Sequence, residues 1–371
     1  MRILALEPYY GGSHRAFLDG WSARSRHDWT VLHLPPHKWK WRMRHGAITL
    51  ADEVAQRSSN SQRWDVLFCS DMLNLAEFLG LAPLEVRQMP AVVYFHENQL
   101  TYPVRHETER DHHYVMTNMT SALAAASVWF NSAFHRDSFL DELPRFLKRM
   151  PDHQPFDTVE RIRAKSSIHH PGVRDFPSRG SRSPGPLRIL WAARWEHDKN
   201  PETFFEAMQR LKAGHVVFRL SVVGEQFRDS PLVFQTARET FCDHIDRWGY
   251  QPSREEYEAA LTEADVIVST ADHEFFGISV VEAIAAGAYP MLPQRLAYPE
   301  ILDAVPDAEH FFYTGGASEL ADRLAALTQR LDHEGLWQGD PDVGVRAVTR
   351  FAWSRRVPDL DDALCAIRAR R

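Results

Sequence analysis

Residues 274–287, EFFGISVVEAIAAG, indicate the fold more clearly than any other stretch of the chain. They follow the apolar run 264–270, ADVIVST, which is typical of a buried strand. A Phe-Phe-Gly turn then leads into an apolar helix that we expect to end at Gly287. A buried strand, a glycine turn and a helix form the repeating unit of open α/β sheets, which bind ligands beyond the carboxyl ends of their strands.

Two glutamates bracket this turn. We expect Glu274 in the loop after the strand and Glu282 in the first turn of the helix. The backbone amides of Gly277, Ile278 and Ser279, at the start of the helix, can bind an anion such as a diphosphate. Carboxylates beside such amides can accept hydrogen bonds from sugar hydroxyls, which suits a nucleotide-sugar. Two glutamates at this spacing can also be ordinary solvated residues at helix ends, so the rest of the chain has to decide.

The composition is that of a globular protein large enough for two domains. The chain has 371 residues, of which 44% are hydrophobic and 25% are charged. No apolar run reaches membrane-spanning length, and the opening MRILAL predicts a strand rather than a signal peptide. Cys69, Cys242 and Cys365 fit neither a zinc spacing nor a disulfide framework, so we expect a cytoplasmic protein without a structural metal or a membrane partner. The net charge of −7 argues against broad nucleic-acid binding but allows a local basic surface.

Short apolar runs alternate with helical patterns, which predicts an α/β protein with doubly wound parallel sheets. In the first half, the expected strands are 2–6, 29–34, 66–69, 91–95, 128–130 and 167–169, and the expected helices are near 13–25, 47–57, 74–80, 112–126 and 133–148. In the second half, the expected strands are 187–192, 218–223 and 265–269, and the expected helices are near 201–212, 229–241, 253–262 and 279–286.

The segment 177–186, PSRGSRSPGP, is the clearest linker, because it is rich in Pro, Gly and Ser and has no apolar period. It separates a first Rossmann-like domain, 1–176, from a second one, 187–353. The segment near 354–371 forms a last helix, which carries on one face Val357, Leu360, Leu364 and Ile367.

Two cations follow the first strand of the second domain. Arg194 and Lys199 fall in the loop before the next helix, where they could neutralise a leaving diphosphate. For either cation alone, a solvated basic loop is the favoured interpretation. Together with Gly224 after the next strand and the glutamate pair downstream, they form a pattern that resembles the donor site of retaining GT-B glycosyltransferases of family 4.

This resemblance implies two Rossmann-like domains that face a cleft, and a C-terminal helix that crosses back to the first domain. The residues that it implies are catalytic are His96, Glu274, Arg194 and Lys199. The residues that it implies bind the donor are Gly11, Gly12, Ser13, His14, Gly224, Tyr250, Gly277, Ile278, Ser279 and Glu282. Within that set, Glu274 would bind the sugar and Glu282 the ribose. Tyr250 could stack beside the nucleotide base or be a half-buried core residue, and the sequence favours neither.

Two motifs in the first domain resemble those of one particular branch of this family. Residues 7–14, EPYYGGSH, follow the first strand, and residues 96–103, HENQLTYP, follow the fourth. Glycines let the backbone approach a ligand closely, and His96 at a strand end could contact the transferred sugar or the attacking hydroxyl. Both motifs resemble those of the tRNA-queuosine α-mannosyltransferases. The resemblance to this family covers nearly the whole chain.

That branch implies transfer of mannose, with retention, from GDP-mannose to the cyclopentenediol of queuosine in tRNA, at the anticodon wobble position of tRNA-Asp. It also implies an acceptor site that contains Glu97, Asn98, Gln99 and Arg110. No Asp-x-Asp motif lies in a loop suited to a metal-bound diphosphate. We therefore expect no metal cofactor, with basic side chains and helix amides in its place.

A basic and aromatic run supports an RNA partner. It consists of Lys38, Trp39, Lys40, Trp41, Arg42 and Arg44. Basic groups neutralise phosphates, and exposed tryptophans stack on unpaired bases. The tryptophans could instead be buried and the cations merely solvated, but the density of the run in an acidic protein favours RNA. Because Pro35 and Pro36 precede it, we expect a loop here rather than a helix that lies on a membrane.

Two other functions stay open from the sequence alone. One is a family 4 transferase that acts on a lipid or a small metabolite. The other is a sugar-nucleotide-binding module that has lost catalysis, although the intact set Arg194, Lys199, Glu274 and Glu282 favours an enzyme. Neither the identity of the hexose nor the oligomeric state follows from any short motif.

Overall fold

The computed structural model describes residues 1–104, 110–177, 182–227, 229–333, 335–337 and 339–369. The chain forms two compact units, Met1–Gly172 with Trp353–Arg371, and Val173–Ala352. The predicted linker 177–186 therefore lies within the second unit, and its residues 178–181 lie outside the described part. Arg182 explains this difference, because its guanidinium donates to both carboxylate oxygens of buried Asp265 (2.9 and 2.7 Å) and so ties the segment to the second unit.

The first unit contains a six-stranded sheet in the order β2-β1-β3-β4-β5-β6. Its strands are β1 (Arg2–Glu7), β2 (Asp28–His33), β3 (Val66–Ser70), β4 (Ala91–Phe95), β5 (Ser127–Phe130) and β6 (Ser166–Ile168). All neighbouring strands run parallel. Because the chain continues from β1 toward one edge and from β3 toward the other, the carboxyl ends of these two strands flank a topological switch point.

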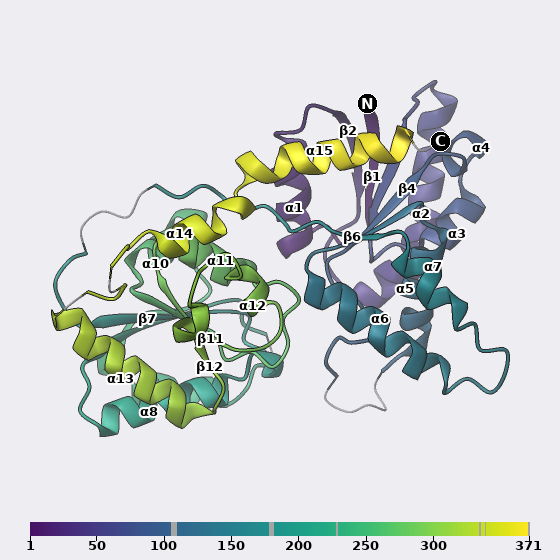
Figure 1. Ribbon diagram of the computed structural model, residues 1–371. Coiled ribbons are helices and arrows are strands. Elements are labelled where there is room, and N and C mark those ends of the chain that lie inside the picture. Colours follow the sequence, from purple (N-terminus) through teal and green to yellow (C-terminus); the bar gives the residue numbers. More distant parts are fainter. Residues whose placement is uncertain (105–109, 178–181, 228, 334, 338, 370–371) are drawn as a thin grey trace. The chain divides into compact units, whose positions relative to one another are not determined.

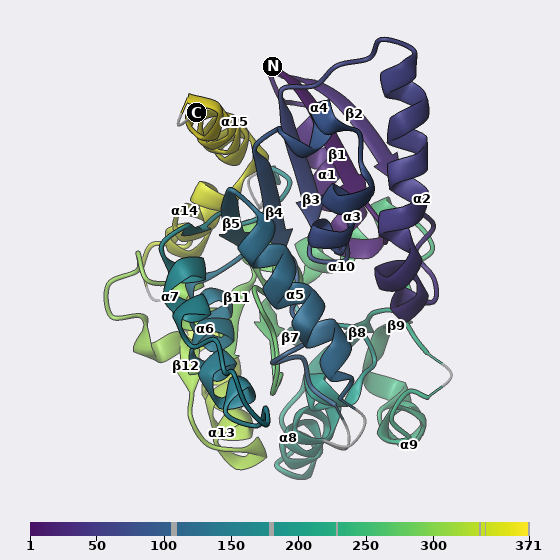
Figure 2. The same ribbon diagram turned by 90° about the vertical axis from the view of Figure 1, so that its right-hand side faces the viewer.

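Helices cover both faces of this sheet (Figures 1 and 2). Successive residues of a strand point to opposite faces. Accordingly, Ile3 and Ala5 pack with α1 (Gly12–Ser22) and α15 (Trp353–Ala369), whereas Leu4 and Leu6 pack with the helices of the other face. Those helices are α2 (Trp39–Ser59), α3 (Leu75–Leu81), α4 (Leu84–Arg87), α5 (His112–Ala124), α6 (Ala133–Leu147) and α7 (Asp157–Arg163).

The C-terminal helix α15 is an integral part of the first unit, as the family resemblance implied. The indole of Trp353 packs so closely on Gly20 and Gly172 that a side chain at either glycine would collide with it. Farther along, buried Asp361 accepts a hydrogen bond from the indole nitrogen of Trp21 (2.8 Å). The predicted apolar face is buried at its first positions, Val357, Leu360 and Leu364, and half-buried at Ile367.

The second unit contains another six-stranded parallel sheet, in the order β12-β11-β10-β7-β8-β9. Its strands are β7 (Leu187–Ala192), β8 (Phe218–Val223), β9 (Ile245–Gly249), β10 (Val266–Val268), β11 (Tyr289–Pro293) and β12 (Phe312–Tyr313). This order is that of dinucleotide-binding Rossmann folds, and its switch point lies between β7 and β10. The prediction of two Rossmann-like folds is therefore confirmed.

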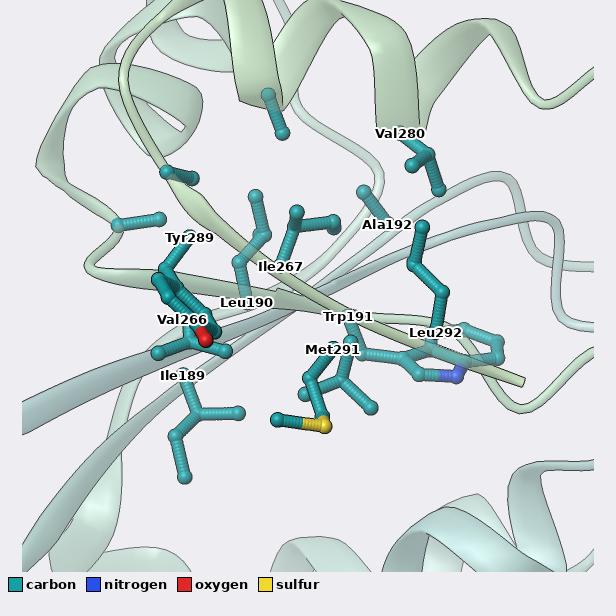
Figure 3. Packing of buried hydrophobic residues seen from close by; sticks show 14 of the residues in the cluster. Ile189, Leu190, Trp191, Ala192, Val266, Ile267, Val280, Tyr289, Met291 and Leu292 are labelled. Atoms are coloured by element: carbon teal, nitrogen blue, oxygen red, sulfur yellow. The ribbon is translucent and has the colours of Figure 1, made fainter. Parts of the chain in front are cut away.

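The helices of the second unit also lie on both faces of the sheet, with α8 and α13 together on one face and α10, α11 and α14 on the other (Figure 1). They are α8 (Pro201–Ala213), α9 (Val233–Thr240), α10 (Arg254–Glu263), α11 (Ile278–Ala285), α12 (Tyr298–Ile301), α13 (Ala317–His333) and α14 (Val343–Val348), with short 3-10 turns η2 (His197–Lys199), η3 (Cys242–His244), η4 (Ala308–Phe311) and η5 (Thr349–Phe351). Figure 3 shows how side chains of the central strands β7, β10 and β11 pack around Trp191, Ile267 and Met291.

Among the helices of the described segments, none is both long and apolar enough to cross a membrane.

Candidate active site

Lys199 and Glu274 meet at the switch point of the second sheet. Lys199 ends η2, which follows β7, and Glu274 follows the neighbouring strand β10. The Lys199 ammonium donates to the carbonyl oxygen of His273 (2.7 Å) and to the Glu274 carboxylate (3.3 Å). It also lies 2.9 Å from the carboxylate of Asp198. The fold thus brings together the cation and the carboxylate that the sequence placed in separate loops.

Both members of this pair carry a charge near neutral pH. Burial alone would lower the pKa of Lys199, but the charges of Glu274 and Asp198 outweigh it and raise that pKa. Burial would raise the pKa of Glu274, but the charge of Lys199 outweighs it and lowers that pKa. Burial, followed by the charge of Lys199, lowers the pKa of His273 to about 4, so this imidazole is neutral.

Arg194 is the more accessible cation of the same loop. Its side chain is 44% exposed, and one guanidinium nitrogen lies 3.2 Å from the carboxylate of Glu196. The loop itself is held in place, because the backbone amides of Asp272 and His273 donate to the carbonyl oxygen of Asp198 (2.8 and 3.2 Å). An anion can therefore reach Arg194 without disturbing the buried pair next to it.

The start of α11 lies beside this loop. Gly277 precedes the helix with φ 91° and ψ 52°, a left-handed conformation that favours glycine. A Cβ at this position would also lie only 3.1 Å from the ring of Tyr298. The Ser279 hydroxyl donates to the carbonyl oxygen of Ala192 (2.6 Å), which fixes the helix start against the end of β7. The first helical amides, at Ile278 and Ser279, have no acceptor within the helix and suit an anion.

Glu282 lies in the second turn of α11 rather than in the predicted first turn, because the helix begins only at Ile278. Its carboxylate is buried and accepts hydrogen bonds from the Arg254 guanidinium (2.7 Å) and the Tyr257 hydroxyl (2.9 Å) of α10. Each carboxylate oxygen therefore has one protein donor and keeps a lone pair for a further hydroxyl.

The remaining predicted donor residues of this unit differ in exposure. A side chain at Gly224 would collide with the carbonyl oxygen of Ala193, so only glycine fits at the end of β8. Tyr250, after β9, is 67% exposed. The core interpretation of Tyr250 is therefore wrong, and its stacking on a nucleotide base stays a prediction.

A second polar cluster occupies the switch point of the first sheet. Glu7 ends β1, and His14 lies in the first turn of α1. The Glu7 carboxylate lies 3.1 Å from His14 Nδ1, and both side chains are buried. Its other oxygen accepts from the Ser70 hydroxyl and the Tyr9 amide, each at 2.9 Å. The ring of His96, after β4, packs on the ring of His14 with the centroids 4.0 Å apart.

Asp71, directly after β3, is a second buried carboxylate of this cluster. Its Oδ1 accepts from the backbone amide of His96 (2.8 Å), and its Oδ2 has no hydrogen-bond partner among the described residues. Burial raises the pKa of Asp71 to about 8, against the opposing charge of His14 and with a contribution from Glu97. The carboxyl group thus carries a proton over much of the neutral range.

The two histidines of the cluster have opposite charge states. Burial would lower the pKa of His14, but the carboxylate of Glu7 outweighs it and raises that pKa to about 9. Burial and the nearby charge of His14 lower the pKa of His96 well below its usual value. Near neutral pH, His14 is therefore an imidazolium and His96 a neutral imidazole.

The ligand atoms of Glu7, His14 and His96 lie within 4.8 Å of one another, a spacing that a metal ion could bridge. However, a metal-bound imidazole nitrogen must give up its proton. Nδ1 of His14 instead shares its proton with the Glu7 carboxylate. The contact between Glu7 and His14 is therefore that of an ion pair with a neutral histidine beside it, and the expectation of no metal stays a prediction.

Of the two glycines at the start of α1, Gly11 is buried and Gly12 is exposed. Gly11 packs against Pro36, which leaves no room for a side chain. Gly12 has φ 51°, and a Cβ there would meet nothing within 4 Å. Ser13 is exposed, so the first amides of α1 are open to a ligand.

Of the residues predicted to bind the acceptor after β4, two stabilise the loop and two are placed to contact a ligand. The buried Asn98 side chain accepts from the Leu100 amide (3.0 Å), and the Arg110 guanidinium donates to the carbonyl oxygens of Gln99 (3.0 Å) and Leu100 (2.7 Å). These bonds give Asn98 and Arg110 a structural role in the loop. Glu97 and Gln99 are half-buried and bonded to each other (3.0 Å), and they remain the candidates for acceptor contact.

The basic run begins helix α2, so the prediction of a loop is wrong. The two prolines lie before the helix, and Lys38 takes the left-handed N-cap position with φ 57°. On this helix start, Trp41 is 61% exposed, and Lys38, Lys40 and Arg44 are exposed as well. We call these four exposed residues the basic surface.

The other two members of the run point inward. The ring of Trp39 packs on that of Tyr114, with the centroids 5.1 Å apart. Arg42 is buried and donates to the carbonyl oxygen of Pro35 (3.0 Å) and to ring nitrogens of His37 (2.9 Å) and His45 (2.8 Å). Three of its five N–H groups are thus used within the protein, and the residue is only 8% exposed.

Sequence reasoning missed the carboxylates Glu7 and Asp71 as site residues, and it missed the role of Arg254 and Tyr257 in holding Glu282. For the carboxylates a signal was present, because each directly ends or follows a buried strand. That signal becomes specific only once the strand order shows that these two strands flank the switch point.

Comparisons with known proteins agree with this division of the chain. Residues 2–173 match the family described as tRNA-queuosine alpha-mannosyltransferase N-terminal, and residues 174–328 match the family described as glycosyl transferases group 1. The boundary between the two matches falls beside the boundary between the structural units. The chain is 37% identical, over 81% of its length and 81% of the relative, to the tRNA-queuosine alpha-mannosyltransferase of Drosophila melanogaster. The chain belongs to the tRNA-queuosine α-mannosyltransferase family.

More distant relatives share one part of the chain or the fold alone. A GDP-mannose:cellobiosyl-diphosphopolyprenol alpha-mannosyltransferase of Xanthomonas oryzae is 28% identical over 52% of this chain and 51% of its own. Among solved structures, Anabaena HepE (TM-score 0.67, 14% identity, 99% and 100% coverage) and a sucrose-phosphate synthase of Thermosynechococcus elongatus (TM-score 0.69, 14% identity, full coverage of both) have the same fold. This chain therefore has the GT-B fold.

Proposed function

We propose that this protein transfers mannose from GDP-mannose to queuosine in tRNA, with retention of the anomeric configuration. One observation carries the proposal. The whole sheet of the first unit falls within the match to the queuosine-specific family, and the same chain holds a charged Lys199–Glu274 pair at the switch point of its second sheet. A queuosine-specific first unit and a sugar-nucleotide site in the second unit are the two parts that this reaction needs. Because the acceptor is a tRNA, we also propose a cytoplasmic location.

The donor lies across the switch point of the second sheet in this proposal. Arg194 and the amides at the start of α11 bind the diphosphate, and Lys199 adds a fixed positive charge. Glu274 accepts from mannose hydroxyls, and Glu282 accepts from the ribose. These groups take the place of a metal ion, and the leaving diphosphate receives the proton of the attacking hydroxyl.

The main alternative to a tRNA acceptor is a lipid acceptor. A loop at residues 38–44 would exclude a helix that lies on a membrane, but these residues begin α2, so the exclusion no longer holds. Membership of the queuosine family takes the place of that argument and favours tRNA. An inactive binding module is disfavoured, because the charged pair and the Glu282 site are intact.

The test is label transfer from GDP-[14C]mannose in EDTA, with tRNA that carries queuosine and with the same tRNA that lacks it. Label should enter only the queuosine-containing tRNA, and UDP- and ADP-sugars should not replace the donor. Transfer to both tRNAs, or to neither, would contradict the proposed acceptor. A strict requirement for a divalent cation would contradict the metal-free donor site.

A further inference from the structure

One side of α10 is directed at the carboxylate of Glu282. Arg254, Tyr257 and Glu258 occupy positions i, i+3 and i+4 of this helix, so their side chains lie on the same side of it. Arg254 and Tyr257 each donate to one oxygen of Glu282, at 2.7 and 2.9 Å. Glu258 instead accepts from Nε of Arg254, at 2.7 Å. Glu258 is therefore linked to Glu282 through Arg254.

The Arg254 guanidinium is held on three sides. Its Nε donates to Glu258 and its Nη2 to Glu282, each at 2.7 Å. The central carbon of the guanidinium also lies 5.1 Å from the centre of the Tyr257 ring. The side chain of Arg254 is nevertheless 40% exposed, and a long arginine side chain gains rotamer freedom when it is released into solvent. Glu258 thus keeps the guanidinium directed at Glu282.

Arg174 anchors Glu258 from the other side. The Glu258 oxygen that accepts from Arg254 also accepts from Nη1 of Arg174, at 2.7 Å. Arg174 lies where the chain enters the second unit, next to Val173, whose amide donates to the carbonyl oxygen of Phe351 (2.8 Å). Positive and negative charges therefore alternate from Arg174 to Glu282.

This network differs from an isolated surface ion pair, which contributes little. It ends on Glu282, which is only 7% exposed and so depends on its protein donors. Because each oxygen of Glu282 has one such donor, each keeps a lone pair for a ligand hydroxyl. The positions of Arg254 and Tyr257 decide where those two lone pairs point.

We propose that Glu258, anchored by Arg174, is a positioning residue for the donor: it fixes Arg254 so that the Glu282 carboxylate can hold both hydroxyls of the ribose. The proposal rests on the proposed function, in which Glu282 binds the ribose. It assigns part of the preference for a ribonucleotide to a residue that acts only through its neighbour. If Glu258 merely stabilised α10, its loss would weaken every nucleotide equally.

The test is calorimetry with GDP and with 2′,3′-dideoxy-GDP, which lacks both ribose hydroxyls. The unaltered protein should bind GDP about 10- to 100-fold more tightly, as expected for hydrogen bonds to a charged group. Glu258→Ala should weaken GDP binding about 3- to 10-fold, the coupling expected within one hydrogen-bonded network, and leave dideoxy-GDP binding unchanged. Glu255→Ala is the matched control, because it removes an exposed carboxylate from the same helix, and it should change neither affinity.

Two further variants show whether Glu258 acts through Glu282. Glu282→Gln should remove most of the preference for GDP, and adding Glu258→Ala to it should cause no further loss. Equal weakening of both nucleotides in Glu258→Ala, or independent losses in the double variant, would overturn the proposal. If Glu258→Ala does not fold, Arg174→Ala decides, because this side chain is 55% exposed. It should also reduce the preference for GDP, and an unchanged preference would overturn the proposal.

Failure of the proposed function gives a different result. If the unaltered protein binds GDP and dideoxy-GDP alike, Glu282 does not bind the ribose, and the positioning role falls with that assignment. If the unaltered protein prefers GDP but Glu258→Ala keeps the full preference, only the positioning role is overturned. Label transfer to queuosine-containing tRNA tests the acceptor separately from both results.

Discussion

The ammonium of Lys199 lies 3.3 Å from the carboxylate of Glu274, across the neighbouring strands β7 and β10. Lys199 is buried, and its three N–H groups face Glu274, Asp198 and the carbonyl oxygen of His273. A donor diphosphate therefore reaches Lys199 directly only if one of these bonds breaks. Arg194, with 44% of its side chain exposed, is the cation that a diphosphate can contact first.

Arg194 and Lys199 should accordingly respond differently to replacement by alanine. Arg194→Ala should lower kcat/KM about 10²- to 10³-fold with little change in stability, because it removes one preorganised charge. Lys199→Ala should lower activity and also cost about 3–5 kcal/mol of folding free energy, because Asp198 and Glu274 lose their shared cation. Steady-state kinetics and urea unfolding of both variants, with the exposed Lys212→Ala as control, make the comparison. Full activity of Arg194→Ala would mean that the diphosphate is held elsewhere.

The two glutamates should separate nucleotide binding from turnover. Glu282→Gln should weaken GDP binding, and so should Arg254→Ala, because the Arg254 guanidinium fixes the Glu282 carboxylate at 2.7 Å. Glu274→Gln should lower turnover while GDP binds as before, since its proposed partner is mannose. Calorimetry with GDP and initial-rate measurements give both quantities for each variant. The reverse pattern would show that the glutamates are assigned to the wrong halves of the donor.

Alternation of apolar runs predicted all six strands of the first sheet, but only β7, β8 and β10 of the second. The central strand β11, Tyr289–Pro293, contains two prolines and yet pairs with β10 and β12. Proline cannot donate to a strand ladder, so a sequence pattern with two of them does not suggest a central strand. Tertiary packing decides here, because the entire strand is buried.

The candidate site was predictable where a residue ends a strand and unpredictable where only a partner defines its role. Arg194, Lys199 and His96 follow strands, and the sequence placed them correctly in loops. The inward turn of Arg42 depends on His37, His45 and the Pro35 carbonyl, which only the three-dimensional structure brings together.

The Glu7–His14 ion pair should make stability depend on pH in the neutral to alkaline range. The pKa of folded His14, about 9, lies above its usual 6.5, so its contribution is complete below pH 6.5 and is lost as the pH rises through about 9. The raised pKa of Asp71 acts in the same direction, with its contribution lost by about pH 8. The raised pKa of His14 alone should make the free energy of unfolding roughly 3 kcal/mol larger below pH 6.5 than above pH 9. Melting temperatures between pH 6 and pH 9 should fall for the unaltered protein and fall less for Glu7→Gln. Equal slopes would show that His14 carries no extra proton in the folded state.

The two tryptophans at the start of α2 should have different roles. Trp41→Ala should cost about 1–3 kcal/mol in tRNA binding if the exposed ring stacks on an unpaired base, and it should leave the melting temperature unchanged. Trp39→Ala should instead lower the melting temperature, because this ring packs on Tyr114. Filter binding to tRNA and thermal unfolding separate the two effects. A Trp41→Ala variant with unaltered tRNA affinity would exclude stacking at this position.

The cations of the basic surface should bind tRNA phosphates, whereas Arg42 should not. Lys38, Lys40 and Arg44 are exposed, so each alanine substitution should reduce the log–log slope of tRNA affinity against salt by about 0.7 to 0.9 and leave GDP affinity unchanged. Arg42→Ala should keep that slope and lower the melting temperature, because it removes three internal hydrogen bonds and leaves the Pro35 carbonyl oxygen without its donor. Tight binding that survives glutamate at all three exposed positions would place the tRNA on a different surface. A changed slope in Arg42→Ala alone would mean that this side chain turns outward when tRNA binds.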